Sequence, residues 1–279
     1  MRTNYQRLEK RKKYPTDISN NGWKELKGLL PQPKSTKENG GRPAIPQREI
    51  INGIFYVIKT GCSWSCMPHD LPHHKSCYHY FRKWSKDGTW QMINTYFVRK
   101  VRKKVFGRQV RPSAAIIDSQ TCKSSSYTHS HRGFDGGKMI TGRKRFILTD
   151  TEGLLLAVWI CSAAVSEKQG AMQLLRSIRM NPKLKKQLGE IKLVFADMGY
   201  RGASLWNYFK ELLGWKIEVV KRNKGQKGFV ILKRRWVVER TFGWMSHSRR
   251  LARDYEKTRH SAQAVLYLAM LPIMLKKLN

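Results

Sequence analysis

Apolar residues recur at helical spacing in three segments of the first part of the chain. In the segment that starts at Arg48, isoleucines return every three or four positions until Gly61 ends the pattern. Segments 75–88 and 89–107 show the same period, with aromatic residues on one face and basic residues between them. These patterns predict a small all-α domain over residues 15–110, of helix-turn-helix type. In the third segment we expect the buried residues to be Met92, Ile93, Tyr96, Phe97 and Val101.

The pattern changes at Arg111, where short β-rich runs replace the helical period. Five runs are apolar enough to form strands: AAIID, RKRFILTD, LLLAVWICSA, IKLVFAD and WKIEVVK. The turn sequence DTEG joins the second run to the third, and helical patterns follow the third, fourth and fifth. Antiparallel strands followed by αβαβα predict a mixed sheet with helices on its faces, an α/β domain over residues 111–279.

The net charge of the chain limits the kinds of partner that it is expected to bind. The chain has 55 basic residues against 19 acidic ones, a formal net charge of +36. A surface this basic repels itself unless it meets a polyanion, and nucleic acid is the usual polyanion. A membrane surface is the weaker alternative. Residues 1–14, with six basic side chains, are expected to form a basic arm.

Two further features point to a cytoplasmic protein. The first residues lack the apolar run of a secretory signal, and the apolar runs 154–165 and 262–275 are shorter than the ~20 residues that span a bilayer. Both runs are therefore expected in the core. Five cysteines at irregular spacing predict reduced thiols rather than disulfides.

Acidic residues are scarce enough for elimination to identify candidates for catalysis. Asp135 and Asp150 lie in turn sequences, and most other acids of this half are expected on solvated faces, namely Glu167, Glu190, Glu211, Glu218, Asp254 and Glu256. Three remain: Asp118 ends AAIID, Asp197 ends LVFAD, and Glu239 lies on a helix. Because sites form at the ends of neighbouring strands, these three carboxylates are expected to converge.

Three converging carboxylates repel one another unless a divalent cation lies between them. Oxygen-only ligands suit Mg²⁺ or Mn²⁺, and paired ions of this kind promote in-line displacement at a phosphodiester. Each acid alone has an ordinary explanation as a cap, a turn residue or an i,i+4 pair such as Arg235–Glu239. A metal site is favoured because the three acids are expected to come together, two at the ends of predicted strands and one on a predicted helix.

Four motifs in this half carry a resemblance to a known family. IIDSQTCK, GFDGGKMITGRKRFILTD, FADMGYRG and RRWVVERTFGWM stand in this order, after the N-terminal motifs GGRPAIPQREI and YHYFRKWSKDGTW. Together they resemble bacterial insertion-sequence transposases of DDE type, in the insertion-sequence-five group of the IS4-like class. The resemblance implies an RNase H-like fold with Asp118, Asp197 and Glu239 as catalytic metal ligands. Arg235 fits the arginine that the family places near the glutamate, whereas Leu232 and Ser246 depart from its tyrosine and lysine.

The resemblance also implies an activity and its partners. It predicts a transposase that binds the terminal inverted repeats of its element, cleaves DNA with Mg²⁺ or Mn²⁺, and acts as a homodimer without a small-molecule substrate. The alternatives are an inactive copy that only binds DNA, and a nuclease of the same fold. The residues expected to contact DNA are Lys75, Arg82, Lys83, Lys86, Lys138, Arg143, Lys144, Arg145, Arg201, Arg235, Arg249 and Arg250.

Cysteines and histidines between residues 62 and 77 suggest a second kind of site. Cys62, Cys66, His69 and Cys77, with His73 and His74 nearby, could ligate zinc, although the spacing departs from regular zinc-finger patterns. Packing of these side chains in a helical core is the simpler interpretation.

Overall fold

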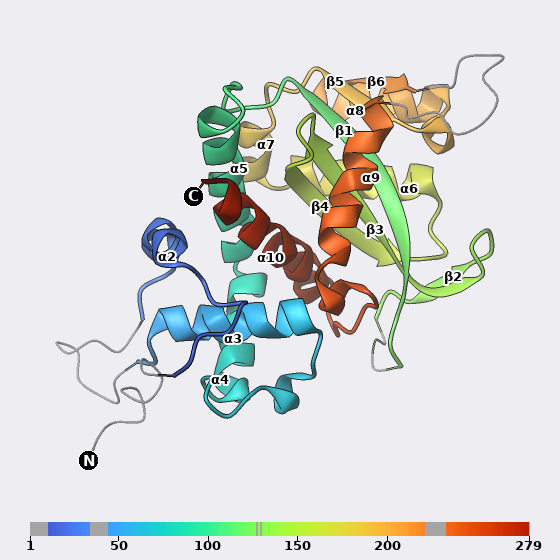
Figure 1. The fold of residues 1–279 in the computed structure, drawn as a ribbon. Coiled ribbons are helices and arrows are strands. Elements are labelled where there is room, and N and C mark those ends of the chain that lie inside the picture. Colours follow the sequence, from blue (N-terminus) through green and yellow to red (C-terminus); the bar gives the residue numbers. More distant parts are fainter. Residues whose placement is uncertain (1–10, 34–43, 127, 129, 221–232, 279) are drawn as a thin grey trace.

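The protein has a helical half and an α/β half that lie side by side (Figure 1). The computed structural model describes residues 11–33, 44–126, 128, 130–220 and 233–278. The basic arm at 1–10 and the loop at 34–43 lie outside the described residues.

The described residues of the helical half form four α-helices, and the apolar spacing predicts the last three of them. The four helices are α2 (Asn20–Leu26, continued by the 3-10 turn η1, Lys27–Leu29), α3 (Gln47–Thr60), α4 (His74–Lys86) and α5 (Thr89–Lys104). A 3-10 turn, η2 (Trp64–Cys66), lies in the connection between α3 and α4, which is longer than the tight turn of a simple helix-turn-helix.

The core of the helical half differs from the prediction at two positions of α5. Ile93, Phe97 and Val101 are buried, but Met92 is 42% exposed and Tyr96 is 37% exposed. Both lie one position away from the buried stripe, so the helix is rotated slightly from the predicted orientation. The Tyr96 ring instead faces solvent, where the Lys100 ammonium lies 5.7 Å from its centroid.

Close packing fixes α3 against α4. A methyl group added at Gly53 of α3 would lie 2.7 Å from the Cys77 sulfur of α4, so only glycine lets the two helices approach this closely. Gly61 ends α3 in the left-handed conformation, with φ of 76°.

The described end of the basic arm is attached to the helical half. The Arg11 guanidinium forms ion pairs of 2.8 Å with Asp17 and Glu49, and its side chain is buried. The Tyr14 hydroxyl donates a hydrogen bond of 2.8 Å to Asp70. The prediction of an arm is therefore wrong for residues 11–14, because acidic partners far along the chain hold them.

The α/β half is built on one six-stranded sheet. Its strands are β1 (Ala114–Lys123), β2 (Gly133–Asp135), β3 (Ile140–Asp150), β4 (Leu155–Ser162), β5 (Leu193–Ala196) and β6 (Lys216–Val219). They follow the order β2-β3-β1-β5-β6, and β4 also pairs with β3. Strands β1, β3 and β4 are antiparallel neighbours, whereas β5 and β6 run parallel to β1. This is the predicted mixed sheet, with the strand arrangement of an RNase H-like domain.

Helices follow β4, β5 and β6, which correspond to the third, fourth and fifth predicted runs, as predicted. They are α6 (Glu167–Arg179), α7 (Pro182–Gln187), α8 (Ala203–Leu213), α9 (Lys233–Ser246) and α10 (Arg259–Leu278), with the 3-10 turns η3 (Met198–Tyr200) and η4 (Arg249–Leu251). Helix α9 crosses the sheet over β1 and β5, and α6 packs on β3 and β4 (Figure 1).

Helix α10 joins the two halves. It packs on α3, α4 and α5 of the helical half and on β4 and α9 of the α/β half. Buried residues of both halves therefore form one continuous core. Within the described chain α10 is long and apolar enough to cross a membrane, but 67% of its apolar stretch is buried inside the protein. It is a core helix, as expected for the run 262–275.

Candidate active site

Two of the three predicted acids lie together at one edge of the sheet. Strand β5 pairs with β1 in parallel register, with Ile116 opposite Phe195, so Asp118 and Asp197 follow at the same level. Asp197 caps η3 by accepting a hydrogen bond of 2.9 Å from the Gly199 amide. Asp118 accepts one of 2.7 Å from the Ser119 amide. The backbone thus orients both carboxylates.

The surroundings of Asp118 disfavour its charge. The pKa of this carboxyl is raised to about 7, mainly by burial and also by the nearby charges of Asp197 and Glu167. The Ser119 amide and the Arg235 guanidinium lower it, but by less than burial raises it. Because the negative charge of Asp118 is disfavoured, a bound cation would stabilise this carboxylate strongly.

Glu239 lies on the correct helix, but its side chain has another partner. Its carboxylate is 3.4 Å from Arg235, one turn earlier on α9, and is 46% exposed. Arg235 is also close enough to Asp118 to lower the pKa of that carboxyl. In the described part of the chain, no three His, Cys, Asp or Glu side chains lie close enough together to hold one metal ion. The structure thus brings two of the predicted acids together and directs the third toward Arg235.

An acid that the sequence pattern did not single out lies beside this pair. Glu167, expected on a solvated face, is the first residue of α6, and its carboxylate reaches Gly199. The Tyr200 hydroxyl next to it is buried and completes no hydrogen bond with any residue that the structure describes. No local sequence signal marks either residue, because α6 and η3 meet only in the folded protein.

Some cations that were expected to contact DNA are exposed. In the α/β half these are Lys138, Arg201 and Arg249, and Arg235 is half-buried at the acids. Four more lie on one face of α4, whose other face packs through Cys77, Phe81 and Trp84. These four exposed residues are Lys75, Arg82, Lys83 and Lys86.

Four other expected DNA contacts lie inside the protein, and this corrects the prediction for them. They are Arg143, Lys144, Arg145 and Arg250. Lys144 donates to the Val165 carbonyl at 2.9 Å, and Arg145 donates to the Leu251 carbonyl at 2.9 Å. Helix α6 covers one face of β3, and carbonyl groups of the segment 251–257 accept hydrogen bonds from Arg143 and Arg145 on the other face, so the strand has no solvated side.

Two acids that were assigned to solvated faces hold the buried arginines. Asp254 lies 3.3 Å from Arg143, and Glu256 lies 2.8 Å from Arg250. Both carboxylates are buried, and burial raises the pKa of Glu256. These pairs stabilise the loop that connects η4 to α10.

The cysteines and histidines of residues 62–77 do not come together as a group of three or more metal-binding side chains within the described residues. Cys77 is buried, donates to the Pro72 carbonyl, and has its pKa raised to about 12 by burial, so its thiol is a poor source of thiolate. His73 accepts a hydrogen bond from the Lys75 amide and thereby caps α4. Of the candidate ligands, Cys77 packs in the helical core and Cys62 is half-buried, whereas Cys66 and His69 are exposed.

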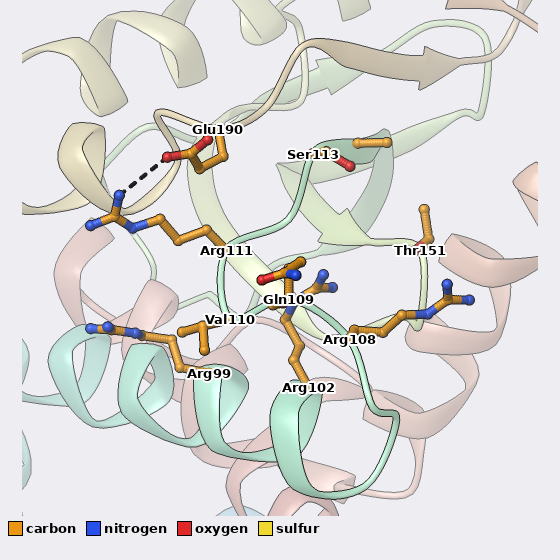
Figure 2. A pocket seen from close by; sticks show the side chains of 10 residues that line it. Arg99, Arg102, Arg108, Gln109, Val110, Arg111, Ser113, Thr151 and Glu190 are labelled. Atoms are coloured by element: carbon orange, nitrogen blue, oxygen red, sulfur yellow. Dashed lines mark hydrogen bonds and ion pairs between the residues drawn. The ribbon is translucent and has the colours of Figure 1, made fainter.

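A hollow of about 660 Å³ lies away from the carboxylates, where the N-terminal end of β1 meets α5 (Figure 2). Arg99, Arg102, Arg108 and Arg111 line it. Three of these arginines are already paired with carboxylates: Arg102 with Asp150, Arg108 with Glu152 and Arg111 with Glu190. The hollow therefore has only a small excess of positive charge.

Comparison with known proteins decides the family. Residues 110–274, more than half of the chain, match the family model "Transposase DDE domain". The chain belongs to the DDE transposase family. Residues 18–94 match a second model, "Putative transposase of IS4/5 family". The insertion-sequence resemblance of the motifs is thus confirmed, and the RNase H-like sheet is the fold of a DDE transposase domain.

Two curated proteins of Burkholderia cepacia share part of this DDE transposase. It is 30% identical over 105 residues to "Insertion element IS402 uncharacterized 16.2 kDa protein", which is 37% of this chain and 69% of that protein. It is 33% identical over 123 residues to "Putative transposase for insertion sequence element IS402", which is 42% of this chain and 54% of that protein. The chain therefore spans about half the length of the second relative.

The donor set suits the divalent ions that transposases of this family generally use. Asp118, Asp197 and Glu167 offer only oxygen, the ligand type that Mg²⁺ and Mn²⁺ prefer. None of these carboxylates forms an ion pair within the described residues. A bound cation would reduce the repulsion among these carboxylates and would offset the free-energy cost of burying the Asp118 charge.

Proposed function

We propose that this transposase binds the terminal inverted repeats of its own element, cleaves DNA there in a metal-dependent reaction, and joins the freed ends to target DNA. The observation that carries the proposal is that Asp118, in the middle of β1, lies beside Asp197, which directly follows the parallel strand β5, inside a domain of the DDE family. The basic surface, with a net charge of +36, supports DNA as the substrate.

Each acid has a role in this proposal. Asp118 and Asp197 would hold the divalent cations, Mg²⁺ or Mn²⁺, and Glu239 would complete the set after leaving Arg235. Bound ions activate the attacking oxygen and stabilise the leaving oxygen of a phosphodiester. Arg235, released from Glu239, and the exposed Arg201 would contact the phosphates on either side of the scissile bond.

Other exposed cations would hold the DNA on both sides of the acids. Lys138 and Arg249 belong to the α/β half, and the basic face of α4 would bind the end of the element. Joining two ends in one reaction requires two active sites, so we propose a homodimer on DNA.

The first test is cleavage of a labelled duplex that carries the element's ends, with Mg²⁺ present. Wild type should cut at the end, and Asp197→Asn should lower the cleavage rate about a thousandfold, since loss of a metal ligand removes several kcal/mol of transition-state stabilisation. Glu211→Gln, which removes the same charge from an exposed position of α8, should leave the rate unchanged.

The outcomes separate the candidate functions. Tight binding of the ends by wild type without any cutting would leave an inactive DNA-binding copy and contradict the proposal. Cutting that is independent of the end sequence would favour a nuclease of the same fold.

The basic face of α4 gives a second prediction. Changing Lys75, Arg82, Lys83 and Lys86 to Gln should weaken binding of the end duplex and reduce the slope of log affinity against log salt by about three to four, since each phosphate contact contributes about 0.9. The control removes four exposed lysines elsewhere, Lys183, Lys185, Lys186 and Lys192. Equal losses in both variants would mean that overall charge, rather than the α4 face, binds the DNA.

A further inference from the structure

Glu167 approaches the catalytic acids from an element outside the strand ends. It is the first residue of α6, after Ser166, which caps the helix with its side chain. The start of α6 packs against η3, the turn that follows Asp197. A helix position that is usually solvated is thus placed at the active site.

The position of the Glu167 carboxylate relative to Asp197 follows from Gly199. A methyl group added at Gly199 would lie 1.8 Å from Glu167 Oε2 and 3.1 Å from Asp197 Oδ1. Because both distances start at one point, the two oxygens are less than about 5 Å apart. Oxygens that share a cation with ligand distances of about 2.1–2.5 Å lie within this separation.

No cation of the protein neutralises this carboxylate within the described residues. Glu167 forms no ion pair there, and its charge acts on Asp118 in the same direction as that of Asp197. Three acids of like charge at one place are unfavourable in the folded protein unless a positive ion accompanies them.

A buried hydroxyl provides independent support for a ligand at this place. Tyr200 is fully buried and lies within the electrostatic reach of Asp118, Glu167 and Asp197. Its hydroxyl is near that of Ser119, but neither oxygen completes a hydrogen bond. A buried polar group without a partner costs about 1–3 kcal/mol, so its position beside the acids points to a polar ligand.

We propose that Glu167 is a further cation-binding residue of the active site, which shares a divalent cation with Asp197. This inference rests on the proposed function, because it concerns the same site. A different role, as a negative charge at the start of α6, would require only that the acid be near the helix end. That role does not account for the approach of its carboxylate to Gly199 and Asp197.

The test measures Mn²⁺ binding to the full chain without DNA, by the electron paramagnetic resonance signal of free Mn²⁺. Glu167→Gln should weaken binding about tenfold or more, as should Asp197→Asn, while Glu211→Gln should bind as wild type does. Gly199→Ala leaves every carboxylate in the chain but displaces that of Glu167, so it should also weaken binding. Gly243→Ala on α9, where an added methyl meets no atom within 4 Å, is its control.

Thermal unfolding in a chelator separates a metal-binding role from a role at the helix end. If Glu167 binds the cation, Glu167→Gln should leave the melting temperature unchanged or raise it, because repulsion among the acids is relieved. Wild-type Mn²⁺ affinity in Glu167→Gln, or no Mn²⁺ binding by wild type, would overturn the inference. Binding that depends on Glu167 in a protein that cuts no DNA would instead contradict the proposed function alone.

Discussion

Asp118→Asn is expected to lose DNA cleavage and yet to unfold at a higher temperature than wild type when divalent ions are chelated at pH 8. The loss of cleavage should be about a thousandfold or more, because the variant lacks a charged carboxylate in the middle of β1 that we propose to bind the metal. The gain in stability comes from removing a charge that burial and two neighbouring acids disfavour.

The sign of the stability change follows from the raised pKa. The folded protein keeps the Asp118 proton up to a pH of about 7, whereas the unfolded chain loses it near the ordinary value of 3.8. Folding therefore becomes less favourable as the pH rises between these values, by up to about 4 kcal/mol. Asparagine carries no such charge and can still accept the hydrogen bond from the Ser119 amide.

Chemical denaturation at several pH values measures this effect. The difference in the free energy of unfolding between Asp118→Asn and wild type should be largest at pH 8 and should vanish near pH 4. Excess Mg²⁺ should stabilise wild type more than the variant. Glu218→Gln, at an exposed position of β6, is the matched control and should show no difference. A variant less stable than wild type at pH 8 would contradict the explanation.

Arg143→Met should lower the free energy of unfolding by about 3–5 kcal/mol, the range for a buried charge that loses its partner. The guanidinium is fully buried, and it donates to the Ser130 carbonyl at 2.6 Å, to the Glu256 carbonyl at 2.9 Å and to the Asp254 carboxylate at 3.3 Å. Methionine fills a similar volume but leaves all three acceptors without this donor.

Urea unfolding provides the measurement, with Lys138→Met as the control from the same hairpin. Lys138 is exposed, so its loss should change stability by no more than about 0.5 kcal/mol. Adding Asp254→Asn to Arg143→Met should recover part of the lost stability, because the unpaired charge is removed. An unchanged urea midpoint for Arg143→Met would show that this buried network contributes little.

The order of elements and the positions of two candidate acids could be predicted because both depend on local patterns. Short apolar runs predict β1 and β5, and the parallel pairing of these two strands brings Asp118 beside Asp197. The sequence did not show that β1 continues past Asp118 to Lys123. Helix α9 is equally visible in the sequence. The direction of the Glu239 side chain is not, because it depends on competition between Arg235 and a bound cation.

The buried arginines and Glu167 could not be predicted, for a different reason. Arg143 and Asp254 are 111 residues apart in the chain, and no local period reports such a pair. A basic run in a strand usually indicates a solvated face, but α6 covers one side of β3 and the segment 251–257 covers the other. Glu167 likewise meets Asp197 only because α6 and η3 pack together.

The placement of α10 affects how the protein folds during translation. This helix follows every strand of the sheet in the chain, yet it covers the apolar sides of α4 and α5. As the nascent chain leaves the ribosome, those two helices emerge long before the segment that shields them. The helical half therefore reaches its final packing only after the α/β half has been synthesised, and the two halves complete their folding together.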